Sequence, residues 1–445
     1  LWGLGLKILI DNRPIRAARE FWTRYSQVNW ALVDQAFVSG CNFLTGILLA
    51  RYLGIEEFGS YVLAWIFVEF AAMLQHSLII SPMMSISPKQ ERDRIPSYLG
   101  SLMIQSGIFL VIVFVTLLAG VFVLNWIQPE QDLRDMALAL GCAACAYQFQ
   151  DFLRRYFFAR FRPVLALVSD VLRYGSQMAA IFVLVYIDSL NAVGALWVMA
   201  GSALLGGLVS LPFVEKLTYS LRDLKATTSR HWRFSKWITL SELMRWTSGD
   251  LFFVISGSLL GPGSVGALRA SRHLVGVCHI FTLGLDNVIP VKAAHHFHVG
   301  GYTALTAYLR KMSAAGGGLI LSVAVVASAA PEFWLNLIYG PQYQGYGYLV
   351  QLWSLVYLLA FLGRPLIAGL RAMEQTRLIF HAYFVTSVIS VALAFPLIQW
   401  FGIAGMMWGI VGIQLLRLIV LLIGFKMRDS NGELAEEASH GKLQS

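Results

Sequence analysis

The sequence predicts an all-α polytopic membrane protein, with twelve transmembrane helices in two six-helix lobes related by a parallel internal repeat. Of the 445 residues, 57% are hydrophobic and only 13% are charged. The mean hydropathy is +0.64, and these values lie outside the range of soluble domains. The chain contains twelve apolar stretches long enough to cross a membrane. Its second half also repeats landmarks of its first half in the same order.

The repeat is clearest at a short turn between two apolar runs. Residues 47–61 read ILLARYLGIEEFGSY and residues 254–268 read VISGSLLGPGSVGAL, so a leucine-glycine pair returns after 207 residues. Because each copy holds an even number of spans, duplication preserves orientation. The lobes should therefore superpose by rotation about an axis near the membrane normal. Further landmarks, at offsets of 209 to 211 residues, are Tyr98 with Tyr308, Arg155 with Arg364, and Trp197 with Trp408.

Each predicted span has at least about 20 residues, the length that crosses a hydrocarbon core of about 30 Å. The spans of the first lobe are 29–50, 59–80, 98–126, 133–153, 164–187 and 192–214. The spans of the second lobe are 237–260, 266–290, 312–338, 346–370, 378–400 and 402–426.

The segments outside the spans set the domain boundaries and the orientation. Residues 1–28 form a basic interfacial segment without the order of a cleavable signal, so we expect it in the mature protein. The terminal segments and the connections on their side hold 26 Lys and Arg residues, against two on the opposite side. By the positive-inside rule both termini are cytoplasmic. The further domains are an N-terminal lobe (29–214), a cytoplasmic linker (215–236), a C-terminal lobe (237–427) and a cytoplasmic tail (428–445).

Six arginines fall inside predicted spans, where an arginine at a helix centre costs about 2.5 to 3.5 kcal/mol to insert. Lipid-facing positions are therefore not expected for Arg173 and Arg245, which should face the protein interior. Arg173 and Arg245 each follow an acid by three residues, which allows neutralisation on one helix face. Arg269 and Arg272 lie one turn apart with no acid within four residues, so they present paired positive charge. The other two arginines are Arg364 and Arg417.

Four acids are candidates either for ion coupling or for charge balance: Asp34, Glu242, Asp250 and Asp286. Asp34 and Glu242 occupy nearly equivalent places in the first spans of the two lobes, 208 residues apart. If the lobes pack around an axis along the membrane normal, both carboxylates could face one central cavity. A buried carboxylate there can carry protons or balance buried arginines, and the sequence leaves both alternatives open.

The sequence predicts no catalytic, metal or cofactor site. It contains no Walker loop, dinucleotide-binding glycine pattern or nucleophile elbow, which excludes ATP as an energy source within this chain. The four cysteines lie inside apolar runs, and the histidine cluster at 295–298 has no acid or cysteine nearby. The outer connections are mostly shorter than about ten residues. That length disfavours a membrane polymerase or glycosyltransferase, which usually needs a large outer loop.

The turn LLARYLGIEEFGSYVLA, residues 48–64, closely resembles the signature near the start of polysaccharide-transporter proteins. These proteins are the O-antigen and exopolysaccharide flippase branch of the multidrug/oligosaccharidyl-lipid/polysaccharide flippase superfamily. The basic segments FLRRYFFARFRP and FLGRPLIAGLRAMEQTR resemble the arginine-rich ends after the fourth and tenth spans of that family. The resemblance covers the length of the chain.

The resemblance implies a non-enzymatic flippase of the bacterial inner membrane. It would move an undecaprenyl-pyrophosphate-linked oligosaccharide, a repeat unit of O-antigen, capsule or exopolysaccharide, to the outer leaflet by alternating access. Its expected partners are this substrate, membrane lipid, and the polymerase and glycosyltransferases of the same pathway, with no nucleic acid. A multidrug and toxin extrusion type antiporter, which moves mainly cations, is the first alternative. A membrane glycosyltransferase or polymerase is the second.

An anionic pyrophosphate needs positive donors. We predict that Arg272, with Arg245, Arg269 and Arg173, binds it in a cavity between the lobes, because an arginine fork holds two phosphate oxygens at once. The alternative for Arg272 is an ion pair with an acid on a neighbouring helix.

Overall fold

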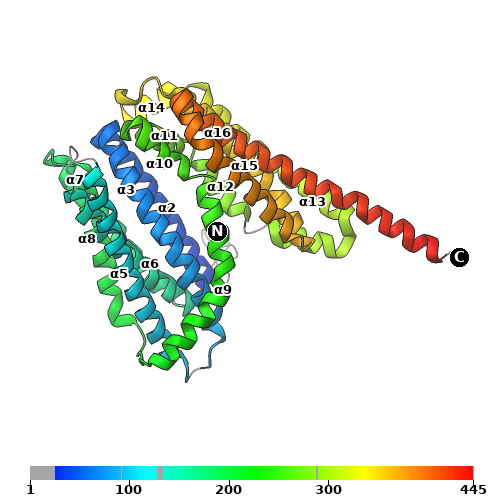
Figure 1. Ribbon diagram of the computed structural model, residues 1–445, viewed down its shortest axis with the longest axis horizontal. Helices are drawn as coiled ribbons and strands as arrows, with labels where there is room; N and C mark the ends of the chain where they lie inside the picture. The colour runs from blue at the N-terminus through cyan, green and yellow to red at the C-terminus, as the bar shows by residue number, and fades with distance from the viewer. Residues whose placement is uncertain (1–25, 92, 128–133, 287–288, 444–445) are drawn as a thin grey trace, which may run out of the picture. The chain divides into compact units, whose positions relative to one another are not determined.

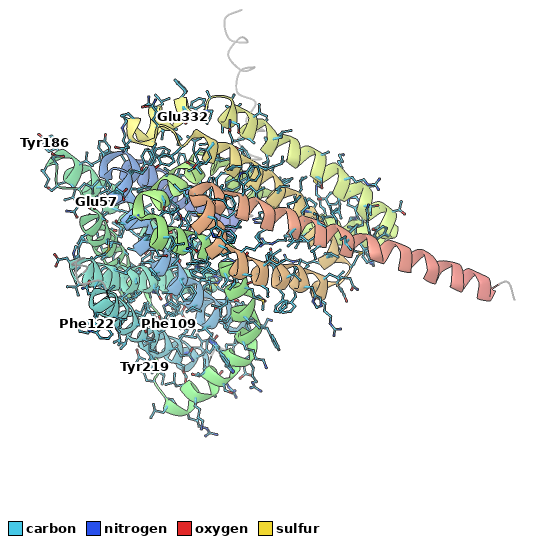
Figure 2. All side chains as sticks on the ribbon, turned by 45° about the horizontal axis from the view of Figure 1, so that its top comes forward. Glu57, Phe109, Phe122, Tyr186, Tyr219 and Glu332 are labelled. Atoms are coloured by element: carbon cyan, nitrogen blue, oxygen red, sulfur yellow. The ribbon has the colours of Figure 1, made fainter. Side chains whose placement is uncertain are left out.

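The computed structural model describes residues 26–91, 93–127, 134–286 and 289–443. Every regular element in these ranges is a helix (Figure 1). The helices carry many exposed apolar side chains, and Phe122 and Tyr186, for example, are 76% and 90% exposed (Figure 2). Water would disfavour so much exposed apolar surface, whereas lipid would cover it. These features confirm the predicted class, an all-α multi-pass membrane protein.

Each of the first six predicted spans coincides with a helix. The second span continues from α3 through a π-helical turn, His76–Ile80, into α4, Ser81–Ile86. Pro82, which has no N–H to donate, lies at the start of α4. The six main helices are α2 (Ser26–Leu53), α3 (Ile55–Gln75), α5 (Ile95–Ile127), α6 (Arg134–Ala159), α7 (Pro163–Tyr186) and α8 (Ala192–Ser210).

The seventh and eighth spans are interrupted, whereas the sequence predicts continuous helices. The first interruption is Ser248–Asp250, where the Ser248 hydroxyl donates to the carbonyl of Arg245 over 2.9 Å. The second is Val275 and Gly276. A hydropathy window of about 20 residues averages over breaks this short, which is why the prediction missed them. The helices on either side are α9 (Leu221–Thr247), α10 (Leu251–Leu260), α11 (Pro262–Leu274) and α12 (Val277–Asp286).

The last four spans also lie on helices. α13 bends at Gly301 and α16 at Gly402, with φ angles of 62° and 60° that glycine adopts at little cost. The bend at Gly402 separates the eleventh and twelfth predicted spans. The bounds are α13 (Ile289–Ala329), α14 (Pro331–Tyr339), α15 (Gly347–Ala372) and α16 (Thr376–Leu443).

Length and hydropathy alone single out eight membrane-spanning stretches in the described part of the chain. One of them, Thr376–Lys426, has 51 residues and contains two of the predicted spans. The three predicted spans outside these stretches lie on α6 and on the two interrupted helix pairs. Those helices carry most of the polar side chains considered below, which lowers their mean hydropathy.

The chain forms two compact units. The first comprises Leu1–Leu44, Leu74–Asp188 and Leu196–Ser235, and the second comprises Thr45–Met73, Ser189–Ala195 and Lys236–Ser445. Because Thr45–Met73 belongs with the second unit, this division does not follow the predicted lobes. The lobe boundaries, and the rotation relating the lobes, stay predictions. The predicted basic segment 1–28 lies almost wholly outside the described residues.

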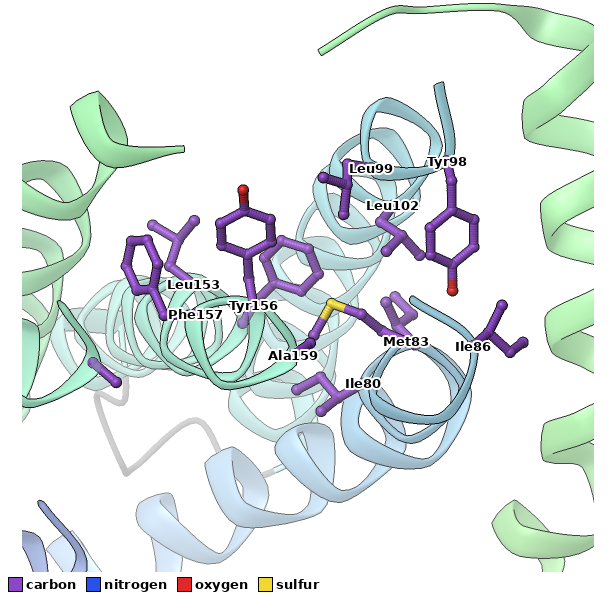
Figure 3. Close-up of a cluster of buried hydrophobic side chains, with 13 residues drawn as sticks. Ile80, Met83, Ile86, Tyr98, Leu99, Leu102, Leu153, Tyr156, Phe157 and Ala159 are labelled. Carbon is purple, nitrogen blue, oxygen red and sulfur yellow. The ribbon is translucent and has the colours of Figure 1, made fainter. Parts of the chain in front are cut away.

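The core of the first unit is built from α4, α5 and α6. Figure 3 shows Met83 of α4 among Ile80, Leu102 and Tyr156, and all four side chains are fully buried. The Tyr156 hydroxyl accepts a hydrogen bond from the backbone N–H of Glu215 over 3.0 Å. Its one polar atom is therefore satisfied inside an apolar cluster.

The second unit contains both copies of the repeated turn, and both have the same backbone conformation. Gly54 ends α2 with a φ of 81°, and Gly261 ends α10 with a φ of 84°. A helix then starts at the next residue in each copy. The Glu56 carboxylate accepts a hydrogen bond from the backbone N–H of Gly263 over 2.9 Å, so the first copy caps the helix that follows the second.

α3 and α11, which follow these turns, cross at two glycines in equivalent positions. A Cβ on Gly59 would lie 1.8 Å from the carbonyl oxygen of Pro262, and a Cβ on Gly266 would lie 2.2 Å from that of Ile55. Neither site has room for a side chain. The glycines of the repeated sequence therefore permit close helix packing.

Candidate functional site

The second unit contains a cavity of about 280 Å³, here called the arginine cavity. Four arginines line it, and Asp250 is the one acid among its described lining residues, so four positive charges and one negative charge give a net charge of +3. Aromatic side chains, including Phe253, Trp353 and Tyr357, form part of the remaining wall. The four arginines are Arg245, Arg272, Arg364 and Arg417.

The helix interruptions shape the arginine cavity. Ser248–Asp250, the break between α9 and α10, lies in its wall. Arg245 is in the last turn of α9, and Arg272 is in the last turn of α11, just before the second break. The backbone N–H groups of Ser248, Gly249 and Asp250 still donate hydrogen bonds to carbonyls of the preceding turn, so the break contributes its shape to the cavity and not free N–H groups.

Arg272 lies against aromatic rings. Its guanidinium carbon is 5.2 Å from the ring centroid of Trp353 and 5.9 Å from that of Phe253. None of the ion pairs found among the described residues includes Arg272, and Asp250 lies in the same cavity without reaching ion-pair distance. The predicted alternative, an ion pair with a neighbouring acid, is therefore not found among these side chains. The side chain of Asp286 lies outside the described residues.

Arg417 is held by neutral groups. Its guanidinium donates to the Ser248 hydroxyl over 3.0 Å and to the Thr386 hydroxyl over 3.5 Å, and it lies 4.6 Å from the ring centroid of Tyr383. No carboxylate among the described residues pairs with it. The sequence placed Arg417 and Arg364 inside spans but did not select them as binding residues. Their positions on α16 and α15, facing the same cavity as Arg272, were the missing information.

Arg245 forms an ion pair on its own helix and also lines the arginine cavity. Its Nε lies 2.7 Å from a carboxylate oxygen of Glu242, three residues earlier on α9, and its side chain is 53% exposed. The local neutralisation considered from the spacing is therefore present for this pair. Because Arg245 also lines the arginine cavity, its charge there is partly balanced by Glu242.

Arg269 does not line the arginine cavity. Its guanidinium lies 2.9 Å from a carboxylate oxygen of Glu69 on α3. The two residues are 200 positions apart, so the search for acids within four residues could not find this partner. The packing of α3 against α11 neutralises Arg269 and separates its environment from that of Arg272.

Arg173 lies in the first unit, buried among neutral groups. It donates to the side-chain oxygen of Gln150 over 2.6 Å, and the rings of Tyr147 and Tyr174 lie 4.5 and 4.7 Å from its guanidinium carbon. The sequence paired Arg173 with Asp170, three residues earlier. In the structure Asp170 forms its ion pair with Arg154 instead, with a distance of 2.5 Å.

Arg154 holds two buried carboxylates at once. It pairs with Asp170 of α7 and with Asp34 of α2, and both aspartates are fully buried. One oxygen of Asp34, Oδ1, has no hydrogen-bond partner among the described atoms. The side chain of Arg154 is itself only 7% exposed. Asp34 and Glu242, predicted as equivalents, therefore have different environments, since Glu242 is partly exposed.

Comparison with known proteins identifies the family. Residues 27–291, more than half of the chain, match the protein family described as polysaccharide biosynthesis protein. This chain belongs to that family. It is also 25% identical over 255 residues to the succinoglycan biosynthesis transport protein ExoT of Rhizobium meliloti. That match covers 56% of this chain and 49% of the relative, so it spans about half the length of the curated protein.

Solved structures show the same fold at low sequence identity. A multidrug resistance MATE family transporter of the MOP superfamily, in an inward-facing conformation, matches with a TM-score of 0.72 and 16% identity, over 90% of this chain and 98% of that one. The lipid II flippase MurJ matches with a TM-score of 0.66 and 13% identity, over 89% and 87%. A MOP superfamily transporter from Pyrococcus furiosus matches with a TM-score of 0.62 and 16% identity, over 90% and 94%. This chain therefore has a fold shared by several transporters.

Proposed function

We propose that this protein is a flippase for an undecaprenyl-pyrophosphate-linked oligosaccharide. It moves the lipid across the bacterial inner membrane by alternating access, with both termini in the cytoplasm. The observation that carries the proposal is the net positive arginine cavity inside an apolar, membrane-spanning unit. The family match and the relative named for succinoglycan transport support a substrate of this class.

The chemistry of the arginine cavity suits a pyrophosphate. Arg272 and Arg417 form no close ion pair with a carboxylate among the described residues, although Asp250 attracts Arg272 from across the same cavity. Their guanidinium groups are therefore placed to bind an anion. Guanidinium groups bind two phosphate oxygens in parallel and keep their charge when partly desolvated. A volume of about 280 Å³ accommodates a pyrophosphate but not a whole oligosaccharide, so the sugar would extend beyond the cavity.

The charge of the arginine cavity also separates the proposal from its alternative. A multidrug antiporter that moves mainly cations needs an acidic cavity, because burying a cation next to unpaired arginines is unfavourable. Here one acid faces four arginines. The MATE structures share the fold at 16% identity, and fold does not fix the transported molecule.

The test replaces Arg272 and Arg417 separately by alanine and measures delivery of glycan to the outer leaflet. We expect a loss of at least about tenfold for each, since a hydrogen bond to a charged group contributes about 1.5–3 kcal/mol. Arg272→Lys should restore only part of the transport, because an ammonium group lacks the planar fork. Arg222→Ala, at an exposed position of α9, is the matched control.

Protein abundance in the membrane must be measured in parallel. Normal abundance with lost transport supports binding of the pyrophosphate. Full transport by Arg272→Ala and by Arg417→Ala at normal abundance would show that the arginine cavity does not bind the substrate.

A further inference from the structure

A second hollow of the same unit takes no part in the site described above. It has a volume of about 820 Å³, within the range of about 300–1,000 Å³ typical of small-molecule sites. We call it the α13 groove, because residues 302–314 of α13 form one wall, while 362–366 of α15 and 418–426 of α16 form the others. It is larger than the arginine cavity, and its charged and apolar side chains lie at opposite ends.

One end of the α13 groove is positively charged. Arg310 and Lys426 line it, both are exposed, and none of the described lining residues is acidic. The Thr306 hydroxyl adds a hydrogen-bonding group. The ring of Tyr302 packs 5.5 Å from that of Phe425 and joins α13 to α16 at this end. Two cations beside a hydroxyl would bind an anionic head group such as a phosphate.

The other end is apolar. Leu362 and Leu366 of α15 face the groove together with Leu418 and Leu422 of α16. The sequence places residues 302–311 of α13 in a cytoplasmic connection and later residues in the ninth span. The charged end would then lie at the membrane surface and the apolar end in the hydrocarbon, as in a membrane lipid itself.

The apolar end reaches the arginine cavity. Leu418 lines both hollows, and no other described residue is shared between their linings. Next to it, α15 and α16 come close at Gly363, where an added Cβ would lie 3.6 Å from the side chain of Leu421. At Leu418 a single side chain therefore separates the two hollows.

We propose that the α13 groove is a loading site for the substrate lipid, with the pyrophosphate at Arg310 and Lys426 and the first isoprene units along the leucines. The inference rests on the proposed function, and it adds a second binding site through which the substrate passes before its pyrophosphate enters the arginine cavity. The shared wall at Leu418 favours the substrate lipid over an ordinary phospholipid, since a phospholipid site needs no connection to the arginine cavity.

The experiment compares two probes on purified protein: farnesyl pyrophosphate, which has a prenyl chain, and inorganic pyrophosphate, which has none. Leu366→Trp fills the apolar end, and the double variant Arg310→Gln/Lys426→Gln removes the charges at exposed positions where folding is not at risk. We expect each variant to weaken binding of farnesyl pyrophosphate by about tenfold or more, since each removes a charged hydrogen bond or the chain contacts. Binding of inorganic pyrophosphate at the arginine cavity, measured as the part of the binding that Arg272→Ala removes, should not change.

Matched controls lie on the same helices outside the groove. Leu393→Trp adds a tryptophan at an exposed position of α16, and Lys292→Gln removes an exposed charge of α13. Neither should alter either affinity. If both groove variants bind farnesyl pyrophosphate as the unsubstituted protein does, the groove is not a loading site. If an equal concentration of phosphatidylglycerol displaces farnesyl pyrophosphate, the groove is a general phospholipid site and the proposal is wrong.

The two proposals fail in different ways. Arg272→Ala should remove the binding of inorganic pyrophosphate at the arginine cavity and leave farnesyl pyrophosphate bound in the groove. If Arg272→Ala removes both ligands while the groove variants have no effect, the loading site is refuted and the arginine cavity stands. If inorganic pyrophosphate does not bind the unsubstituted protein but the groove variants weaken farnesyl pyrophosphate, the loading site stands without the arginine cavity.

Discussion

Arg154 is a buried arginine, with only 6% of the residue exposed. It lies between Asp34 and Asp170, so two buried carboxylates share one guanidinium and the three groups sum to one negative charge. Removing one member of a buried ion pair is costly, because the remaining charge loses its partner and has no water. The two aspartates are not equivalent, because Asp170 also accepts a hydrogen bond from Gln150 over 2.8 Å, whereas Oδ1 of Asp34 has no hydrogen-bond partner in the described part of the chain.

This difference predicts distinct effects for two substitutions. Asp34→Asn leaves the pair of Arg154 and Asp170 intact, so we expect normal abundance. If Asp34 couples transport to an ion gradient, the variant should lose at least about tenfold of its gradient-driven transport, because the amide cannot take up a proton. The measurement is glycan delivery with and without an imposed gradient. Unchanged transport would exclude Asp34 from coupling and leave charge balance as its role.

Arg154→Ala is the contrasting variant. It leaves two carboxylates buried side by side, and we expect a loss of stability of about 3–5 kcal/mol, measured as reduced membrane abundance and a lower melting temperature. Combining it with Asp34→Asn should recover part of that loss, since one of the two unpaired charges is gone.

At the scale of helices, His231 joins α9 to α5. Its Nε2 lies 3.0 Å from the Tyr98 hydroxyl, and only 3% of the residue is exposed. Burial, with a smaller effect of the neighbouring Arg230, lowers the pKa of His231 to about 4, against 6.5 in the unfolded chain. The native state therefore keeps this histidine neutral in a range where the unfolded state binds a proton.

The free energy of unfolding should consequently fall as the pH falls from 6.5 toward 4, by up to about 3 kcal/mol from this group, with no contribution above about pH 7.5. Melting temperatures at pH 7.5 and pH 5 measure the effect. His231→Gln, which cannot be protonated, should show a smaller decrease between the two pH values. An equal decrease in both proteins would assign the pH dependence to other groups.

The crossing of α3 and α11 gives a further test on this scale. Gly59→Ala and Gly266→Ala would each place a methyl group about 2 Å from a carbonyl oxygen of the other helix, at 1.8 and 2.2 Å. Backbone must move to relieve such a contact, so each should destabilise the protein by roughly 1–3 kcal/mol or more. Gly318→Ala, where an added Cβ meets nothing within 4 Å, is the matched control. Equal melting temperatures for all three variants would contradict the crossing.

The sequence predicted features that depend on local pattern better than contacts between residues far apart in the chain. Hydropathy and spacing predicted that the apolar stretches are helices and that the glycines of the turn recur, although the seventh and eighth spans are interrupted. The cost of burying charge predicted that Arg272 faces a cavity rather than lipid. The partner of Arg269 is 200 residues away, and that of Arg154 is 120 residues away. Such pairs depend on how helices pack, which periodicity along one helix does not contain.

The whole molecule carries an asymmetry of charge, with 26 Lys and Arg residues on one side of the predicted spans and two on the other, from which we predict its orientation. This predicts that the connection between α7 and α8 lies outside the cell membrane and the connection between α8 and α9 lies in the cytoplasm. Ser189 and Thr218 are exposed positions in these two connections.

A protein without its native cysteines, all four of which are free thiols, allows a direct test with single cysteines at these positions. Ser189→Cys should react with a membrane-impermeant maleimide in intact cells whose outer membrane is permeable, because its connection faces the periplasm. Thr218→Cys should react only after the inner membrane is opened. Each variant is the control for the other, since both thiols are exposed and differ only in the predicted side. Reaction of Thr218→Cys in intact cells, with Ser189→Cys protected, would invert the orientation and place the charged end of the α13 groove on the side opposite to the lipid donor.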